Sequence, residues 1–205
     1  MGLALHFILG FITSFLGTLT PSMLNMTAVK ISINKSKSEA VKFAIGVSIV
    51  VLFQAYIAIS FTKLLRENPY FLKSLQKIAV VIFSLLSFYF YHQSKKDKIS
   101  TNSLKEKATN SFTVGLLLSA LNMFSIPFYC GITTVLNVAG WLQFSRQNSI
   151  IFVVGSAIGT FTLLYLYLYF AKEIQLKSLI LAKNLNLILS VLAGVMALFT
   201  LIKLL

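Results

Sequence analysis

Acidic side chains are scarce in this 205-residue chain, which has five Asp and Glu residues against 18 Lys and Arg. Charged residues make up only 11% of the sequence, whereas 57% is hydrophobic and the mean hydropathy is +0.85. These values exclude a water-soluble globular domain. In a soluble protein the net charge of +13 would suggest nucleic acid as a partner. Here the basic residues flank apolar segments, so membrane orientation explains them and no nucleic-acid partner is expected.

Charge is absent from six long stretches of the sequence. They are residues 1–29, 43–62, 78–93, 108–145, 147–171 and 184–202. Each is near or above the roughly 20 apolar residues that a helix needs to cross about 30 Å of hydrocarbon. We therefore predict an all-α integral membrane protein with six transmembrane helices, centred near residues 15, 51, 85, 124, 163 and 195. The whole chain, 1–205, is expected to form a single membrane domain in contact with the lipid bilayer.

The residues needed for metal, redox or catalytic chemistry are also few. The lone Cys130 excludes an intramolecular disulfide and any cysteine-pair site. No Asp, Glu, Lys or Arg lies in the middle of a predicted helix, which argues against a carboxylate proton relay and against a site for Mg²⁺ or Ca²⁺. His6 and His92 lie near helix ends without a partner at metal-ligand spacing, so we expect them at the interfaces. No catalytic residue, metal or cofactor is predicted, and the chain is not expected to be an enzyme.

The loops between the predicted helices set the orientation. The loops after the first, third and fifth helices carry 12 Lys residues, and the opposite side carries six Lys and Arg. The positive-inside rule therefore places the richer side in the cytoplasm and both termini of this multi-pass protein outside. The first apolar stretch has no preceding basic residue and is too long for a signal core, so no cleavable signal peptide is expected.

Two of the three prolines lie within long uncharged stretches and have matching surroundings. The first pattern is Gly10-x3-Ser14-x6-Pro21-x5-Thr27, and the second is Gly115-x3-Ser119-x7-Pro127-x5-Thr133. A proline inside a helix removes a backbone donor and leaves carbonyls that another group must satisfy. In lipid such a break is tolerated only where it is buried in protein or lines a wet cavity. We therefore predict that helices 1 and 4 are broken at Pro21 and Pro127, at equivalent points of two halves.

A polar segment divides the chain almost in half. Residues 94–110 are rich in Lys, Ser, Thr and Asn and have the composition of a linker, here predicted to be cytoplasmic. Each half, 1–93 and 111–205, then holds three helices, and an odd number requires homologous halves to have opposite orientations. The Gly155-x3-Gly159 pattern permits close helix approach. Packing within the chain explains it more simply than a dimer seam, although a homodimer stays possible.

Neutral polar residues gather around the two prolines. The candidate residues of the substrate pathway are Thr20, Pro21, Ser22, Asn25 and Thr27 around the first, Asn122, Ser125, Pro127 and Thr133 around the second, and Gln54 near the middle of the second predicted helix. Two interpretations remain open for each of them. Such side chains satisfy the carbonyls freed by the prolines or bond between helices, or they line a site. Uncharged hydroxyls, amides and free backbone groups suit a zwitterion such as an amino acid.

Residues 17–30 (GTLTPSMLNMTAVK), the basic loop after them and Phe43-Ala-Ile-Gly46 resemble the start of the LysE/RhtB family of bacterial amino-acid exporters. Residues 115–122 (GLLLSALN) resemble the family's Gly-rich entry to helix 4. The chain departs from the family's pattern at two places. Thr20-Pro21-Ser22 replaces Pro-Gly-Pro, and Val50-Val51-Leu52 stands where helix 2 often carries an acidic residue. The resemblance implies transport, but not proton coupling through a carboxylate of helix 2.

The sequence and the resemblance together indicate a secondary transporter of the bacterial inner (plasma) membrane. It would export amino acids or related small metabolites by alternating access of two inverted three-helix halves. The alternatives are a small-ion or metal-ion permease of the same superfamily, a membrane thiol-reductant carrier, and a non-transporting membrane subunit. The thiol carrier would need a cysteine beside each proline, whereas Ser22 follows Pro21 and Phe128 follows Pro127.

Overall fold

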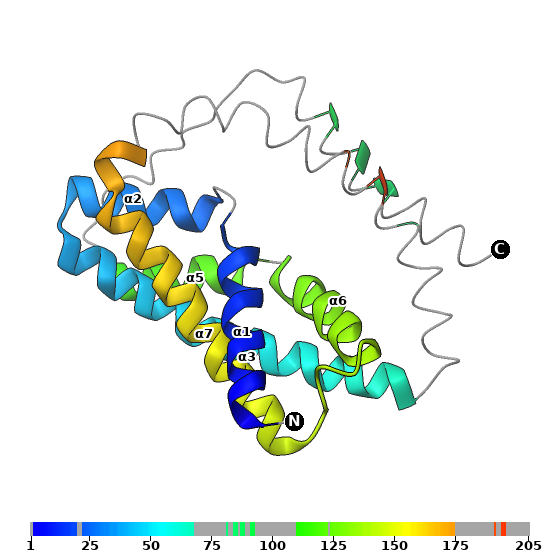
Figure 1. The fold of residues 1–205 in the computed structure, drawn as a ribbon. Coiled ribbons are helices and arrows are strands. Elements are labelled where there is room, and N and C mark those ends of the chain that lie inside the picture. Colours follow the sequence, from blue (N-terminus) through cyan, green and yellow to red (C-terminus); the bar gives the residue numbers. More distant parts are fainter. Residues whose placement is uncertain are drawn as a thin grey trace. The chain divides into compact units, whose positions relative to one another are not determined.

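A computed structural model describes residues 2–19, 22–67, 110–122 and 124–174, with single positions in 81–92 and 191–195. The chain divides into two compact units, one of residues 1–63 and 106–176, the other of residues 64–105 and 177–205. All contacts discussed below lie within the first unit. The described helices are α1 (Leu3–Gly17), α2 (Met23–Asn34), α3 (Lys37–Glu67), α5 (Ser111–Ala120), α6 (Ser125–Val138) and α7 (Arg146–Tyr169), and only the last four residues of α3 belong to the second unit (Figure 1). No strand occurs among these described residues.

The long helices agree with an integral membrane protein. Over the described ranges, α3 and α7 are long and apolar enough to cross a bilayer, and α5 with α6 adds a third span if the bent pair is counted as one. The predicted first helix comprises two pieces, the short apolar α1 and then α2. Apart from the single positions, the predicted third and sixth helices lie outside the described residues, as does the linker except for Asn110.

Side-chain caps explain where three of the helices begin. Ser22, Asn110 and Ser145 precede α2, α5 and α7, and the side-chain oxygen of each accepts a backbone N–H from the first turn of its helix. Such caps satisfy amide groups that have no partner within the helix. The α6 helix differs, because its N-cap, Phe124, offers no side-chain acceptor.

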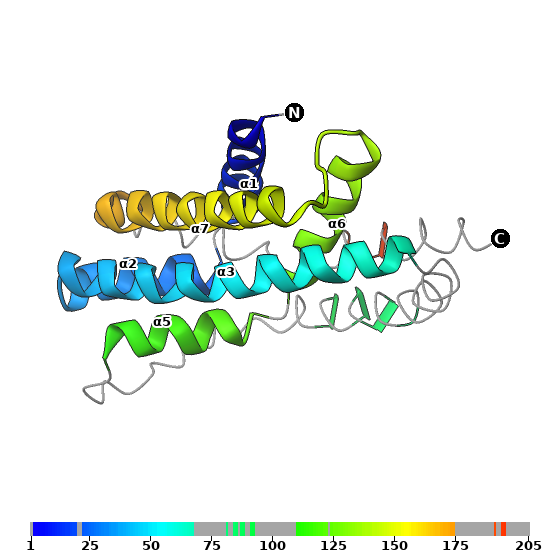
Figure 2. The same ribbon diagram turned by 90° about the horizontal axis from the view of Figure 1, so that it is seen from below.

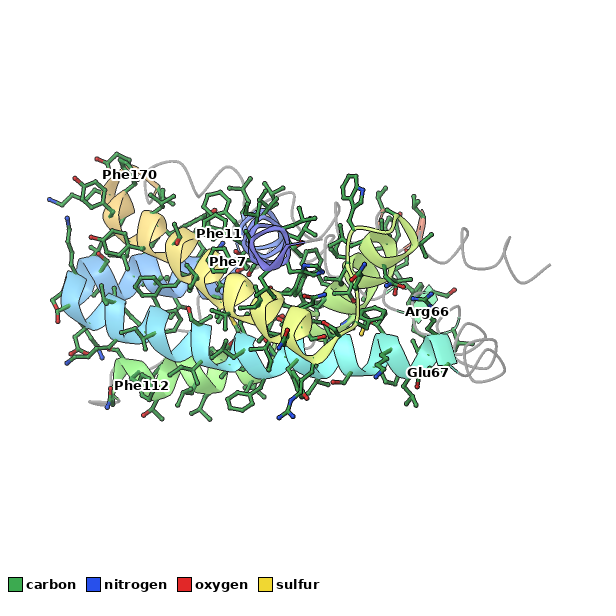
Figure 3. All side chains as sticks on the ribbon, turned by 60° about the horizontal axis from the view of Figure 1, so that its bottom comes forward. Phe7, Phe11, Arg66, Glu67, Phe112 and Phe170 are labelled. Atoms are coloured by element: carbon green, nitrogen blue, oxygen red, sulfur yellow. The ribbon has the colours of Figure 1, made fainter. Side chains whose placement is uncertain are left out.

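Glycines bring the helices into direct backbone contact at two crossings. Where α1 crosses α7, a Cβ at Gly10 would overlap the carbonyl of Phe152, and one at Gly155 would overlap the carbonyl of Phe7. Figure 3 labels Phe7 and Phe11 at this crossing. Gly159 likewise lies against the carbonyl of Phe11. Close approach of this kind is how helices associate where lipid removes the hydrophobic driving force.

The crossing of α5 with α3 has the same geometry as that of α1 with α7. A Cβ at Gly115 of α5 would overlap the carbonyl of Phe43, and one at Gly46 of α3 would overlap the carbonyl of Phe112. All four helices therefore carry the same Phe-x2-Gly sequence at the contact, with Phe7, Phe43, Phe112 and Phe152 each three residues before its glycine. Figure 2 shows α3 between α7 and α5. Each crossing joins a helix of one half to a helix of the other.

Contacts at the helix ends match the grouping of loops on which the predicted topology depends. The Lys37 Nζ lies 4.7 Å from the centroid of the Tyr169 ring, and Ser32 Oγ donates to the carbonyl of Leu168 over 2.9 Å. The turn between α2 and α3 therefore lies at the end of α7. At the start of α1, the backbone N–H of Gln143 donates to His6 Nε2 over 3.3 Å. His6, which we expected at the interface, is fully buried beneath the loop between α6 and α7.

Candidate functional site

The first helix break comprises residues 18–22, between α1 and α2. The last carbonyls of a helix have no partner within it, and leaving them unpaired in an apolar environment costs several kcal/mol each, on the order of 2–7. Here Asn25 Nδ2 donates to the carbonyl of Thr18, and Tyr167 Oη donates to the carbonyl of Leu19, both over 2.7 Å. Side chains of α2 and α7 thus satisfy the end of α1.

The second break comprises residues 121–124, between α5 and α6, whose axes differ by 62°. Gln54 Nε2, from α3, donates to the carbonyl of Ser119 over 2.8 Å. The Ser125 N–H donates to the carbonyl of Asn122 over 3.4 Å at the start of α6. Pro127 is the third residue of α6, where an amide hydrogen would have no partner within the helix. The amides of Asn25 and Gln54 therefore each donate to a carbonyl next to a break, but the Ser119 carbonyl also accepts the Asn122 N–H over 3.0 Å, so the Gln54 bond is its second.

A buried hydroxyl cluster connects the two breaks. Ser14 Oγ lies 2.8 Å from Tyr129 Oη and 2.5 Å from Thr160 Oγ1. Ser14 is one turn before the end of α1, Tyr129 is in the second turn of α6, and Thr160 lies on α7 next to Gly159. All three are buried, with exposed fractions of 0–3%. The cluster brings the end of one broken helix against the start of the other.

One face of α3 extends past the second break. From Gln54 onward, residues spaced by four contact first α5 and then α6. The Cys130 Sγ donates to the carbonyl of Ala58 over 3.5 Å, and Thr62 Oγ1 lies 3.1 Å from Thr133 Oγ1. Gln54 is the first residue of this series and contacts the end of α5, whereas the next two contact α6, so Gln54 lies beside the break.

The predicted pathway residues have different environments. Asn25, Gln54 and Thr133 are buried and bond across helices or to the end of a broken helix. Ser22 caps α2, and Thr27 Oγ1 bonds to the carbonyl of Met23 in its own helix. Asn122 and Ser125 are half-buried at the second break, and Pro127 is exposed. Thr20 and Pro21 lie outside the described residues.

The candidate residues chosen from the sequence do not include Ser14, Tyr129, Thr160 or Tyr167. Ser14 was visible in the repeated Gly-x3-Ser pattern, and Thr160 directly follows the second glycine of Gly155-x3-Gly159. Tyr167 had no such signal, because its contact with Leu19 depends on how α7 packs against α1.

The chemistry of the cluster is neutral throughout. The hydrogen bonds described at both breaks join hydroxyls, amides, a thiol and backbone groups, with no charged side chain taking part. Over the part of the chain that the structure describes, no three His, Cys, Asp or Glu side chains gather as metal ligands would. The site offers hydrogen-bond donors and acceptors without a fixed charge.

Comparison with known proteins identifies the family. Residues 15–204 match the family model of LysE type translocators, so the chain belongs to this family and is a multi-pass membrane translocator. The match confirms the resemblance seen at residues 17–30 and 115–122. No curated protein and no solved structure matches the chain.

Proposed function

We infer that this translocator exports amino acids or related small metabolites across the bacterial inner membrane, with both termini outside. Transport takes place by alternating access, and the site lies where the breaks before α2 and α6 meet. The observation that carries this proposal is the convergence of both breaks on the hydroxyl cluster of Ser14, Tyr129 and Thr160.

The neutrality of this region is what suits the proposed substrate. A zwitterion carries both charges itself, so its site needs acceptors for the ammonium and donors for the carboxylate, but no fixed charge. Ends of interrupted helices provide both kinds of group, because N-termini attract anions and carbonyl ends attract cations. Hydroxyls such as that of Tyr129 donate and accept, and they adapt to either end of the substrate.

The two helix crossings support inverted halves. Gly10 and Gly155 join α1 to α7, and Gly115 and Gly46 join α5 to α3, in each case through the carbonyl of a phenylalanine three residues before the opposing glycine. The same contact made twice, each time between the two halves, is what a pair of related, oppositely inserted repeats would produce. Rocking of one half on the other would then pivot on these crossings.

The alternatives have less support from the described residues. A permease for divalent metal ions would need ligands with negative charge, and the two breaks offer neutral groups. A thiol-reductant carrier would need a second cysteine near Cys130, whose thiol donates to the Ala58 carbonyl. A non-transporting membrane subunit would not explain two equivalent breaks that meet at buried hydroxyls.

Growth of bacteria expressing the chain tests the proposal. Cells are challenged with toxic amino acids, amino-acid analogues and metal salts, next to cells with an empty vector. We expect resistance to a subset of the amino acids or analogues and no change with the metals. Selective resistance to metal salts would favour the permease instead, and an unchanged response to every compound at normal membrane levels would remove the exporter.

A further inference from the structure

Gln54 has one polar atom that the fold leaves without a partner. The side chain is only 6% exposed, and its Oε1 is buried without a hydrogen-bond donor among the described residues. The orientation of the amide is determined by its other end, because only Nε2 can donate to the carbonyl of Ser119. An amide flip would place two acceptors against each other. Oε1 is therefore a fixed acceptor, and leaving a buried acceptor unpaired is unfavourable.

The start of α6 is the complementary group. This 14-residue helix begins at the same break, and its N-cap provides no side-chain acceptor, whereas α2, α5 and α7 all have one. The first amide groups of a helix have no partner within it and point along the axis with the positive end of the helix dipole, which favours an anion. Pro127 contributes no donor and the Ser125 N–H already donates to the carbonyl of Asn122, so among the described residues the Ile126 N–H and the positive end of the helix dipole are what this end presents to an anion.

Both groups lie at one level of the structure. Gln54 bonds to Ser119, near the end of α5, and the next residues of the same α3 face, Ala58 and Thr62, contact α6. The break between α5 and α6 therefore lies beside the Gln54 amide. A ligand there must donate to Oε1 and place negative charge at the start of α6. An α-amino acid has an ammonium and a carboxylate on one carbon, so one head group would satisfy both needs.

We propose that the break between α5 and α6 binds the head group of an α-amino acid, with its ammonium donating to Gln54 Oε1 and its carboxylate at the N-terminus of α6. This proposal depends on the exporter function inferred above and narrows its substrates to molecules that have both groups free. The side chain of the substrate is then free to vary, because neither contact involves it.

The test uses the full chain purified into liposomes loaded with the 20 unlabelled proteinogenic L-amino acids. Counterflow of the same mixture, labelled with ¹⁴C and supplied outside, is measured at increasing concentration. Competitors are the amines obtained by decarboxylation and the acids in which hydrogen replaces the ammonium. We expect neither set to compete at concentrations where unlabelled amino acids do.

Three variants separate binding from structure. Gln54→Leu should raise the half-saturating concentration roughly tenfold or more, because a hydrogen bond to a charged group is lost. Gln54→Glu, when protonated, keeps a donor for Ser119 and an acceptor for the ammonium, so it should restore most of the affinity. The matched control is Ser48→Ala, also in α3. Within the described ranges its buried hydroxyl bonds to the Ala44 carbonyl of its own helix and to no other helix, so this variant should match the wild type.

The outcomes distinguish the two proposals. If counterflow occurs and Gln54→Leu leaves its concentration dependence unchanged, or if the amines or acids compete as well as amino acids, the head-group site is wrong and the exporter stands. If no label exchanges in the wild type, the exporter proposal fails and the head-group site fails with it.

Discussion

Gly115→Ala tests the helix crossing of α5 with α3. An added Cβ would overlap the carbonyl of Phe43, which is backbone and cannot rotate away, so the two helices must move apart. Overpacking lowers the free energy of unfolding by about 1–3 kcal/mol, and we expect a value near the upper end because the neighbouring atom belongs to the backbone. Alanine returns about 1 kcal/mol of helix propensity, leaving a loss of about 2 kcal/mol. For a chain of this size that corresponds to a fall in Tm of about 4–8 °C.

Gly131→Ala is the matched control for this substitution. Gly131 lies inside α6, and nothing lies within 4 Å of the position that its Cβ would occupy. The variant should gain the helix propensity of about 1 kcal/mol and raise Tm by about 2–4 °C. Thermal unfolding of both variants in the same detergent is the measurement. A Gly115→Ala variant at least as stable as Gly131→Ala would refute the close crossing and the pairing of the halves based on it.

Three further predictions concern single residues, and a fourth concerns the membrane orientation. Tyr129→Phe should lower the free energy of unfolding by about 1 kcal/mol in the same assay, for the lost bond to Ser14; unchanged stability would contradict a formed cluster. Pro127→Ala should stay in the membrane but lose most counterflow, because the amide donor returns and the helix can extend across the break; full counterflow at equal expression would show a merely tolerated kink. Cys130→Ser should leave counterflow intact, because a hydroxyl can still donate to Ala58, whereas inactivity at normal levels would favour thiol chemistry. A phosphatase fused after Leu205 should be active, and fluorescence from the matching cytoplasm-specific fusion would overturn the orientation.

The presence of a spanning helix was predictable wherever an uncharged stretch was long enough to cross a membrane. The uncharged stretch 43–62 predicted a span, and α3 extends beyond it in both directions, from Lys37 to Glu67. Long Lys side chains place their charge at the interface while their apolar stems stay against the helix, so a span continues past its first lysine. The same argument covers α7, which begins at Arg146 and therefore includes the residue that bounded its uncharged stretch.

The contacts of the candidate site were less predictable than its composition. Proline spacing indicated Asn25 and Thr133, which are both buried, and Gln54, also buried, was chosen for its place in the middle of the second predicted helix. The link between Ser14 and Thr160 joins residues 146 positions apart, and it forms only because α1 and α7 approach through glycines. The signal for that approach was present in the four Phe-x2-Gly sequences. These sequences become informative only when it is known which helices cross each other. The periodicity within one helix does not determine its partner.

The two interpretations that the sequence left open for the polar residues are compatible at Gln54. An amide side chain has a donor end and an acceptor end, and satisfying a freed carbonyl uses only the donor. The bond from Nε2 adds a second donor to the Ser119 carbonyl near the end of α5, and it fixes Oε1 as the acceptor end of the amide. A serine or threonine hydroxyl could rotate to satisfy itself on its own helix, as Thr27 does. An amide cannot, because its two ends are rigidly joined. A glutamine whose Nε2 donates to Ser119 therefore keeps Oε1 in place as an acceptor for a ligand.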